Sequence, residues 1–582
     1  MKDYDAIVIG GGINGLTAAT YLAKSGMSVA VFERRGQCGA HCDTLELGMP
    51  GFLHNLHATW LITAMSPAME DLDLVGHGLE LVATDVAYAK EFLSGRNCLL
   101  SLNPQVSLES VTSASSKDAE FIQRSAVFFA SHLPEVIEVF NAFFTEAPSL
   151  ERLSSAATFL DGVAKETGLP ITSHDLQSMT GFEGLEVFFD SEELKTTLAS
   201  LAWIGGLPPI HRRVGVLGAL MLASLTGTFF PVHQATGGSH AVTHSLVRAA
   251  AAAGVEIWTT SPVDRILVEN GRATGVRLEN GGLLGETEVR APVVISDLTV
   301  APTFLRLIGE DEIGVPWATK IKAFVYDEQV LFGVYYALSG DPVFRSAERS
   351  PGIQRSFMGF FGGETLEEMR GVGADLISGV INDTILGNWF IPTRADPAQA
   401  PEGMATSFVW VDVPPNPRSW HGKRLPGWDA WPDIKEALAD EVTDAYERYA
   451  PGFKDLVLER FIMTPPDQER NNPSAVKGNW IGGSMLPEQV FANRPVPGLV
   501  PEGSASRTFI PGLYLANSIH PGSTTWLCSG YLAAKEVAVD AGTFDPAWWK
   551  ARAFDWYLQN MARIPTNRGV DPKWLSGGRS GG

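Results

Sequence analysis

Residues 5–33 read DAIVIGGGINGLTAATYLAKSGMSVAVFE, and this stretch decides the fold. An apolar strand runs directly into Gly10-x-Gly12-x-x-Gly15, a helix of small residues follows, and a second apolar strand ends at Glu33. In this pattern Gly10 permits a tight turn, Gly12 lets a pyrophosphate approach the backbone, and Gly15 lets the helix pack closely on the sheet. Glu33 lies near the usual spacing of about 20 residues for the acid that binds ribose hydroxyls. The stretch predicts a βαβ unit with a dinucleotide site; a βαβ unit without a ligand is the alternative.

The composition is that of a folded protein with more than one domain. The chain has 582 residues, of which 45% are hydrophobic and 19% are charged. This length exceeds what one simple core supports, so two or more domains are expected. The net charge of −22 argues against nucleic acid or an anionic membrane as the main partner.

Cysteine usage and the chain start give two further expectations. The four cysteines, Cys38, Cys42, Cys98 and Cys528, are too few for a disulfide scaffold. Cys38 and Cys42 lack a second pair that would complete a zinc site, so no metal is expected. Because the first strand begins almost at Met1, we expect no signal or transit peptide and a cytoplasmic location.

One apolar segment, residues 214–230, tests the expectation of a soluble protein. Its length is at the short limit of the range of about 17–25 residues for a membrane-spanning helix. We expect a buried helix that leads into a strand, with no transmembrane span. A peripheral membrane contact stays open as the alternative.

The rest of the chain predicts a second part of the nucleotide domain far from the first. After Gly237-Gly238 come an alanine-rich helix at 241–253 and short strands, two of which are followed by Asn-Gly turns. These strands are expected at 255–259, 263–269, 273–279, 286–289 and 292–297, and longer strands at 324–338 and 406–413. The pattern predicts an α/β fold with a Rossmann-type nucleotide-binding domain at 1–70, 230–310 and 500–545. A discontinuous α+β substrate domain is expected at 71–229 and 311–499, and a C-terminal helix and flexible tail at 546–582.

A segment near the C-terminus completes the pattern. Residues 509–522 read FIPGLYLANSIHPG, a buried strand followed by a Pro-Gly loop and a further helix. Together with Gly10–Gly15, the stretch 39–52, the stretch 237–297 and residues 464–470, it resembles the phytoene desaturase-like family. This family lies within the flavin-containing amine oxidase and carotenoid desaturase superfamily, and the likeness is best to its soluble, non-carotenoid branch.

The resemblance implies non-covalent FAD on a nucleotide domain of the glutathione-reductase type (GR2-like). The adenosine diphosphate and flavin are then expected on Gly10, Gly12, Ile13, Asn14, Gly15, Glu33, Arg34, Gly39, Ala40, Val263, Asn517, His520, Gly522 and Trp526. The chain departs from the family pattern in two places where the flavin ring is expected. Gly39-Ala40 stands for the usual Gly-Gly and is followed by His41-Cys42, and the glycine-rich C-terminal loop reads Ser523-Thr524-Thr525-Trp526.

A flavin accepts hydride itself, so no protein nucleophile is expected. His54 and His57 are candidates for accepting the accompanying proton, with a structural role as the alternative for each. Trp526 is a candidate wall of the reaction site or plain core. His41 or Cys42 could tether the flavin, and Lys322, on an expected strand, could hold a water. Five aromatic residues are candidates for an apolar pocket or for core packing: Trp203, Trp389, Phe390, Trp410 and Trp480.

The sequence therefore predicts an FAD-dependent oxidoreductase that removes hydride from a carbon of an apolar or alicyclic small molecule, as desaturases and dehydrogenases do. Oxygen, a quinone or another carrier would accept the electrons. A flavin amine oxidase is the alternative enzyme. A non-catalytic binding protein like the GDP-dissociation inhibitors, which share the fold, is the alternative of another class.

Overall fold

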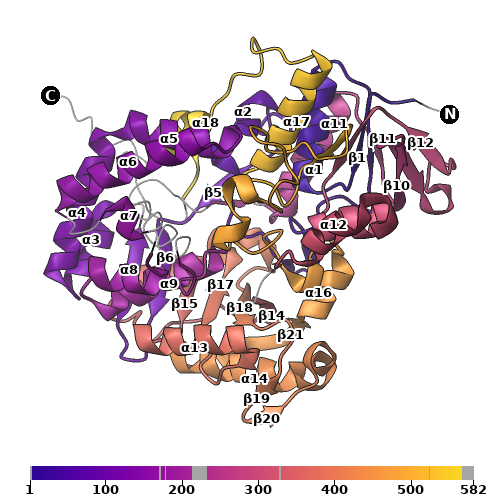
Figure 1. Ribbon diagram of the computed structural model, residues 1–582. Coiled ribbons are helices and arrows are strands. Elements are labelled where there is room, and N and C mark those ends of the chain that lie inside the picture. Colours follow the sequence, from indigo (N-terminus) through magenta and orange to yellow (C-terminus); the bar gives the residue numbers. More distant parts are fainter. Residues whose placement is uncertain are drawn as a thin grey trace.

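The computed structural model describes residues 3–101, 103–168, 172–176, 178–212, 233–326, 329–522 and 525–566 (Figure 1). The apolar segment predicted at 214–230, residues 523 and 524 of the C-terminal loop, and the last part of the predicted tail lie outside these residues.

The first sheet is parallel and contains both strands of the opening stretch. Its order is β22-β13-β1-β2-β9, with β1 in the centre. The strands are β1 (Ala6–Ile9), β2 (Val29–Phe32), β9 (Glu256–Trp258), β13 (Val293–Ser296) and β22 (Leu513–Leu515). Helix α1 (Ile13–Lys24) connects β1 to β2, as the sequence predicts. Segments from three distant parts of the chain therefore end side by side at one edge of this sheet.

The two faces of the first sheet are covered differently. Ala6 and Val8 pack toward α1, α11 (His240–Ala252) and α17 (Cys528–Ala541), which lie together in Figure 1. Ile7 and Ile9 pack toward the antiparallel sheet β10-β11-β12 on the other face. Side chains alternate between the two faces of a strand, and both faces of β1 are covered. All four residues of β1 are therefore apolar and buried.

The antiparallel sheet confirms the predicted hairpins. Its strands are β10 (Val263–Glu269), β11 (Arg272–Leu278) and β12 (Glu288–Arg290). Asn270 and Gly271 between β10 and β11 both have positive φ angles, 51° and 74°. A two-residue hairpin turn of this type needs positive φ at both positions, which explains the Asn-Gly pair.

The second sheet has seven strands in the order β21-β14-β18-β17-β15-β6-β7. They are β6 (Val86–Glu91), β7 (Asn97–Ser101), β14 (Val330–Leu338), β15 (Met358–Phe361), β17 (Gly387–Phe390), β18 (Ala405–Val413) and β21 (Val457–Met463). All pairs are antiparallel except β15 with β6. On β14, Leu331 and Tyr335 pack toward α8 (Gly181–Phe188), α9 (Glu192–Ile204) and α13 (Leu366–Ser378). Phe332 and Tyr336 pack toward α14 (Trp431–Tyr449).

Helices from the first third of the chain form a layer beside the two sheets (Figure 1). They are α3 (Pro104–Thr112), α4 (Ser116–Ser131), α5 (Leu133–Thr145), α6 (Leu150–Thr167) and α7 (Ser173–Leu176), and α5 contacts α17. Among the described residues no single helix is long and apolar enough to cross a membrane. The helix pair 116–128 and 133–145 has the required length and apolarity only when its two helices are taken together, and it is bent by 83°.

The remaining elements are short. The helices are α2 (Ala68–Asp71), α12 (Glu310–Lys322), α15 (Phe453–Leu456), α16 (Pro465–Asn471) and α18 (Asp555–Asn560). The strands are β3 (Thr44–Glu46), β4 (Leu53–Asn55), β5 (Leu81–Ala83), β8 (His233–Ala235), β16 (Val380–Ile381), β19 (Ser419–Trp420) and β20 (Lys423–Arg424).

Two local predictions were wrong. The strand predicted at 324–338 begins only at Val330, and the residues before it follow a helix instead. Lys322, also expected on a strand, lies in the last turn of α12 and pairs with Glu310 at its first turn. Acidic residues at the start of α12 and lysines at its end complement the helix dipole, which favours the helix over an extended chain.

Candidate active site

The loop after β1 forms a cradle at the start of α1. Gly10 has a φ of 98°, and a Cβ on Gly15 would overlap the carbonyl oxygen of Gly10. Helix α1 begins after Gly12, which has no side chain to cap it, so the backbone N–H groups of its first turn other than that of Gly15 are available to an anion. A Cβ on Gly12 would overlap the carboxyl group of Asp297, which lies directly beside it.

Glu33 holds this loop from the end of β2. The carboxylate is buried, and its two oxygens accept hydrogen bonds from the N–H groups of Gly11 and Arg35, each at 2.8 Å. Arg35 is in turn bonded to Asp43, at 2.6 Å, and the His240 Nδ1 lies 2.7 Å from the same carboxylate. Burial alone would raise the pKa of Asp43, but the hydrogen bonds from His240 and Arg35 outweigh it and hold the pKa below its usual value. The loop at 33–43 is therefore held to Gly11 through Glu33 and to the start of α11 through Asp43.

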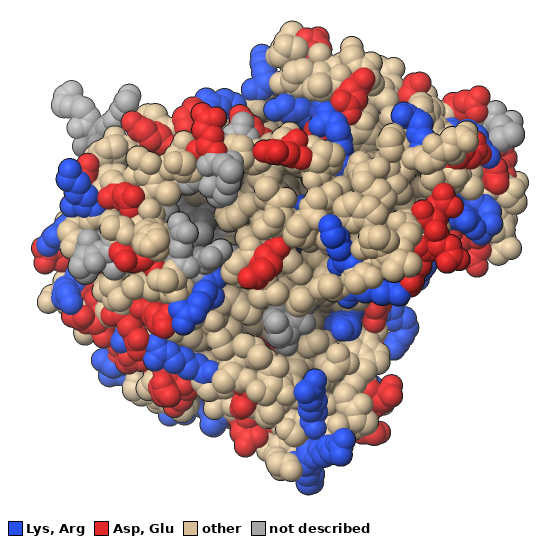
Figure 2. All heavy atoms as spheres, in the orientation of Figure 1, with Lys and Arg blue, Asp and Glu red and all other residues tan. Residues whose placement is uncertain are grey.

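These residues open into one large cavity. Its volume is about 1710 Å³, which exceeds the range of about 300–1,000 Å³ for a pocket that holds one small ligand. The cavity has room for a dinucleotide and a substrate together. Figure 2 shows a hollow on this face, with acidic and basic side chains scattered around it and no single charged patch.

Most of the sequence-predicted cofactor residues lie in the wall of this cavity. They are Gly10, Gly12, Ile13, Asn14, Glu33, Arg34, Gly39, Ala40, Val263, Asn517, His520, Gly522 and Trp526. Gly15 lies behind the wall, where α1 packs on the end of β1. The residues present fit FAD, because the glycine cradle, the buried Glu33 and the N-terminus of α1 converge on one elongated space.

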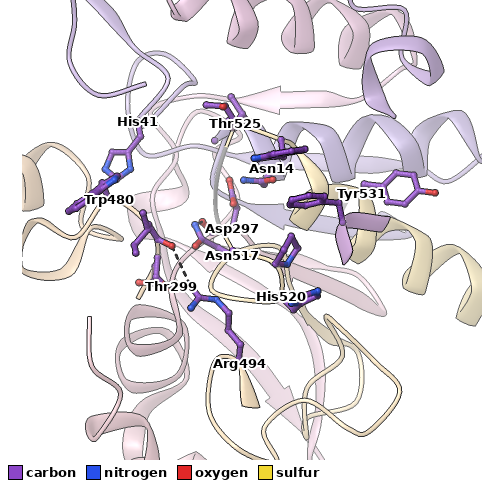
Figure 3. A pocket seen from close by; sticks show the side chains of 18 of the residues that line it. Asn14, His41, Asp297, Thr299, Trp480, Arg494, Asn517, His520, Thr525 and Tyr531 are labelled. Atoms are coloured by element: carbon purple, nitrogen blue, oxygen red, sulfur yellow. Dashed lines mark hydrogen bonds between the residues drawn. The ribbon is translucent and has the colours of Figure 1, made fainter. Parts of the chain in front are cut away.

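Asp297 is a part of this cradle that the sequence reasoning did not single out. It follows β13, and its carboxyl group is only 8% exposed. It accepts hydrogen bonds from the N–H groups of Gly15 and Gly12, and the Asn517 side chain donates to its carbonyl oxygen at 3.1 Å. Burial, and then the nearby Glu33 carboxylate, raise the pKa of Asp297 well above its usual value. Figure 3 shows Asp297 and Asn517 together in the middle of the pocket.

The far end of the cavity carries positive charge near Val263. Arg34 and Arg306 both line the wall there. Burial, and then the charge of Arg34, lower the pKa of Arg306, so the two guanidinium groups are close enough to influence each other. Two neighbouring cations at this end suit the phosphates or ribose of a nucleotide.

The opposite end of the cavity contains two histidines. The rings of His41 and His57 are 4.4 Å apart between centroids and tilted by 46°. Burial lowers the pKa of His41 to about 4. Burial, and then His41, lower the pKa of His57 well below its usual value. Both rings are therefore neutral at neutral pH.

His54, the other predicted catalytic histidine, is placed elsewhere. It lies on β4, and its ring packs edge-on to Tyr335 with the centroids 6.1 Å apart. Among the described residues, those that line the cavity include His57 but not His54.

The C-terminal loop closes the cavity against helix α5. His520 Nε2 lies 2.8 Å from the carbonyl oxygen of Phe143, and the Trp526 ring stacks on Phe144 with the centroids 3.9 Å apart. Trp526 therefore lines the cavity and is also packed on α5.

Cys42 also lines the cavity, and its thiol donates to the carbonyl oxygen of Ser239 at 3.1 Å. Burial raises the pKa of Cys42 to about 12, so the reactive thiolate that a flavin tether would need is disfavoured.

Three of the five predicted pocket aromatics line the cavity: Phe390, Trp410 and Trp480. Trp203 and Trp389 do not line it and lie in the core, the alternative that the sequence left open for each. Trp203 is packed in the core on α9, where its indole N–H bonds to Gln329. Trp389 and Phe390 are neighbours on β17 and point to opposite faces, so Trp389 is buried against Phe344 instead.

Comparison with known proteins agrees with this site. Residues 8–73 match an NAD(P)-binding Rossmann-like domain, and residues 128–302 match an FAD-binding domain. The chain is 31% identical to mouse pyridine nucleotide-disulfide oxidoreductase domain-containing protein 2, over 92% of this chain and 94% of that one. It is 27% identical to one of the subunits of the limonene dehydrogenase of Castellaniella defragrans, over 94% and 96%. A putrescine oxidase structure has the same fold, with a TM-score of 0.56 and 15% identity over 93% of this chain and all of that one.

The fold, the cradle and the matched domains define an FAD-dependent oxidoreductase. Carotenoid desaturases are also among the relatives. The chain belongs to the phytoene desaturase-like family of flavin-containing oxidoreductases, which confirms the resemblance seen in the sequence.

Proposed function

We propose that the protein removes a hydride from a carbon of an apolar or alicyclic small molecule and so introduces a C=C bond. The observation that carries the proposal is the composition of the cavity beyond the dinucleotide cradle. Ile204, Leu331, Phe390 and Trp410 form an apolar wall that can bury a hydrocarbon body. The limonene dehydrogenase and the carotenoid desaturases among the relatives are named for substrates of this kind.

His57 is the group we propose as the proton acceptor. Forming C=C from two C–H bonds releases one proton in addition to the hydride, and FAD, when bound, supplies the hydride acceptor. His57 is neutral because burial lowers the pKa of its ring, and it lines the cavity. A neutral imidazole has a free lone pair, so it can take up the proton. The electrons then pass to oxygen, a quinone or another carrier.

The test mixes the FAD-loaded protein anaerobically with monocyclic and linear hydrocarbons. We expect loss of the visible flavin absorption and a product two hydrogens lighter by mass spectrometry. His57→Ala should slow this step by roughly 10²–10⁴-fold and leave the flavin bound. His54→Ala is the matched control, because His54 is buried but outside the cavity wall.

The pH profile gives a second readout. Because the pKa of His57 is lowered, wild-type turnover should show no loss at the ordinary histidine pKa and should fall only at more acidic pH. Unchanged turnover in His57→Ala would remove His57 from the reaction. Absence of flavin reduction by any apolar substrate would overturn the proposal itself.

A further inference from the structure

Several polar atoms at the histidine end of the cavity have no hydrogen-bond partner among the described residues. Among them are His41 Nε2, both ring nitrogens of His57 and the hydroxyl of Thr59. All three residues line the cavity, and His57 and Thr59 are only 4% and 2% exposed. Buried polar atoms are nearly always paired, because leaving them unpaired costs free energy. Their grouping in one wall indicates a binding site for a polar group.

His41 determines what kind of polar group fits. A hydrogen bond to the backbone of Trp480 raises the pKa of His41, so the ring donates through its other nitrogen to a carbonyl oxygen. Figure 3 shows His41 beside Trp480. Burial nevertheless keeps the ring neutral, with a pKa of about 4. A neutral imidazole carries one N–H, so His41 Nε2 is a lone-pair acceptor that needs a donor.

His57 and Thr59 can complete the site. A neutral His57 offers one N–H donor and one acceptor, and its ring is within stacking distance of His41. The Thr59 hydroxyl can donate or accept. A ligand that both donates and accepts is therefore matched by this wall, and a hydroxyl group does both.

The surroundings of the site disfavour a ligand that carries a permanent positive charge. The nearby Arg35 disfavours positive charge on His41, and burial does the same for both histidines. An ammonium group would meet the same field and the same desolvation cost. A neutral O–H is therefore favoured over a protonated amine.

We propose that the substrate is an otherwise apolar alcohol whose hydroxyl donates to His41 Nε2 and accepts from His57 or Thr59. The apolar body then lies against Leu331, Phe390 and Trp410. This inference rests on the proposed function, which places the substrate in this cavity, and it narrows the substrate class to apolar alcohols. When His57 donates from one nitrogen to the hydroxyl, the other nitrogen keeps its lone pair for the proton released in the reaction.

The first experiment compares ligands of one carbon skeleton that differ in a single group. Menthol donates and accepts, menthone only accepts, and p-menthane does neither. Their dissociation constants are measured with the FAD-loaded protein from the shift of the flavin spectrum on titration. We expect menthol to bind roughly 10- to 100-fold more tightly than p-menthane, with menthone between the two because it accepts from His57 or Thr59 but cannot donate to His41. Linear and two-ring alcohols with their parent hydrocarbons are titrated as well, so that the result does not depend on one shape.

The second experiment removes the acceptor. His41→Phe should lower the affinity for the alcohol to about that for the ketone, and Thr59→Val should lower it by less. His54→Phe is the matched control and should keep the wild-type ratio, because His54 lies outside the cavity wall. Flavin content and the melting temperature show whether each variant is folded.

The inference is overturned if no alcohol of any skeleton binds more tightly than its hydrocarbon, or if His41→Phe keeps the preference. Its failure is separate from that of the proposed function. Hydrocarbons that reduce the flavin without any preference for alcohols would leave the proposed function standing. A preference for alcohols without hydride removal would support the alcohol-binding site and contradict the proposed function.

Discussion

Replacing Asp297 with asparagine should remove a pH dependence from FAD binding. The carboxyl group of Asp297 is buried at the N-terminus of α1, hydrogen-bonded to the N–H groups of Gly12 and Gly15. Burial, and then Glu33, raise its pKa well above the usual aspartate value, so the neutral form of this carboxyl group persists to higher pH than in a free aspartate. Asparagine has nearly the same shape and stays neutral at every pH.

The direction in which FAD affinity changes with pH follows from the charges at this site. The pyrophosphate of FAD is expected at the same helix terminus, so its negative charge should raise the pKa of Asp297 further. FAD affinity should therefore be constant below the pKa of the apoprotein. Above it, affinity should fall by up to about tenfold per pH unit, which is the 1.36 kcal/mol carried by one proton. The folded apoprotein should also lose stability as pH rises through this raised pKa, because the native state holds the proton more tightly than the unfolded chain.

The assay titrates apoprotein with FAD and follows the flavin fluorescence from about pH 4, near the ordinary aspartate pKa, to about pH 10. In Asp297→Asn the dissociation constant should stay flat over the range in which the wild type weakens. Asp264→Asn is the matched control: Asp264 lines the cavity but is exposed and paired with Arg277 at 2.8 Å, so the wild-type slope should remain. Equal slopes in Asp297→Asn and the wild type would refute the reasoning.

Two further substitutions test the cradle and the core. Gly12→Ala places a Cβ on the Asp297 carboxyl group, whereas Gly36→Ala on the following loop meets nothing within 4 Å. Gly12→Ala should weaken FAD binding at least about tenfold, since one charge-assisted hydrogen bond contributes about 1.5–3 kcal/mol, and Gly36→Ala should leave it unchanged. Equal affinities of the two variants would show that Gly12 is not at the cofactor. Trp389→Ala should lower the free energy of unfolding in urea by about 3–5 kcal/mol, because the side chain is fully buried, with normal flavin content in the folded protein. A loss of flavin without a loss of stability would place Trp389 at the site after all.

The parts of the fold that the sequence predicts are those whose signals are contiguous. Gly10, Gly15 and Glu33 belong to one βαβ unit, so their spacing alone brings them together. The hairpin turn at Asn270-Gly271 is equally local, because both residues must have positive φ. The resemblance to a family adds the distant segments, such as Asn517 beside the end of β13.

What the sequence does not reveal depends on which face of a strand a residue occupies. Strand β17 is buried at all four positions, so no alternation of apolar and polar residues distinguishes Trp389 from Phe390. His54 and His57 lie three residues apart, yet only His57 lines the cavity. Asp297 belongs to the site because it is buried against Gly12, which follows a different strand of the sheet. No local sequence pattern indicates that contact.

The visible absorption spectrum of the purified protein, taken before and after acid precipitation, tests the central claim most directly. We predict flavin bands in the native protein that move into the supernatant, because we assign FAD to the glycine cradle that Glu33 holds in place, and because the Cys42 thiol is hydrogen-bonded to the carbonyl oxygen of Ser239. Flavin that stays with the pellet would contradict non-covalent binding. A colourless protein that cannot be reconstituted with FAD would contradict the account as a whole.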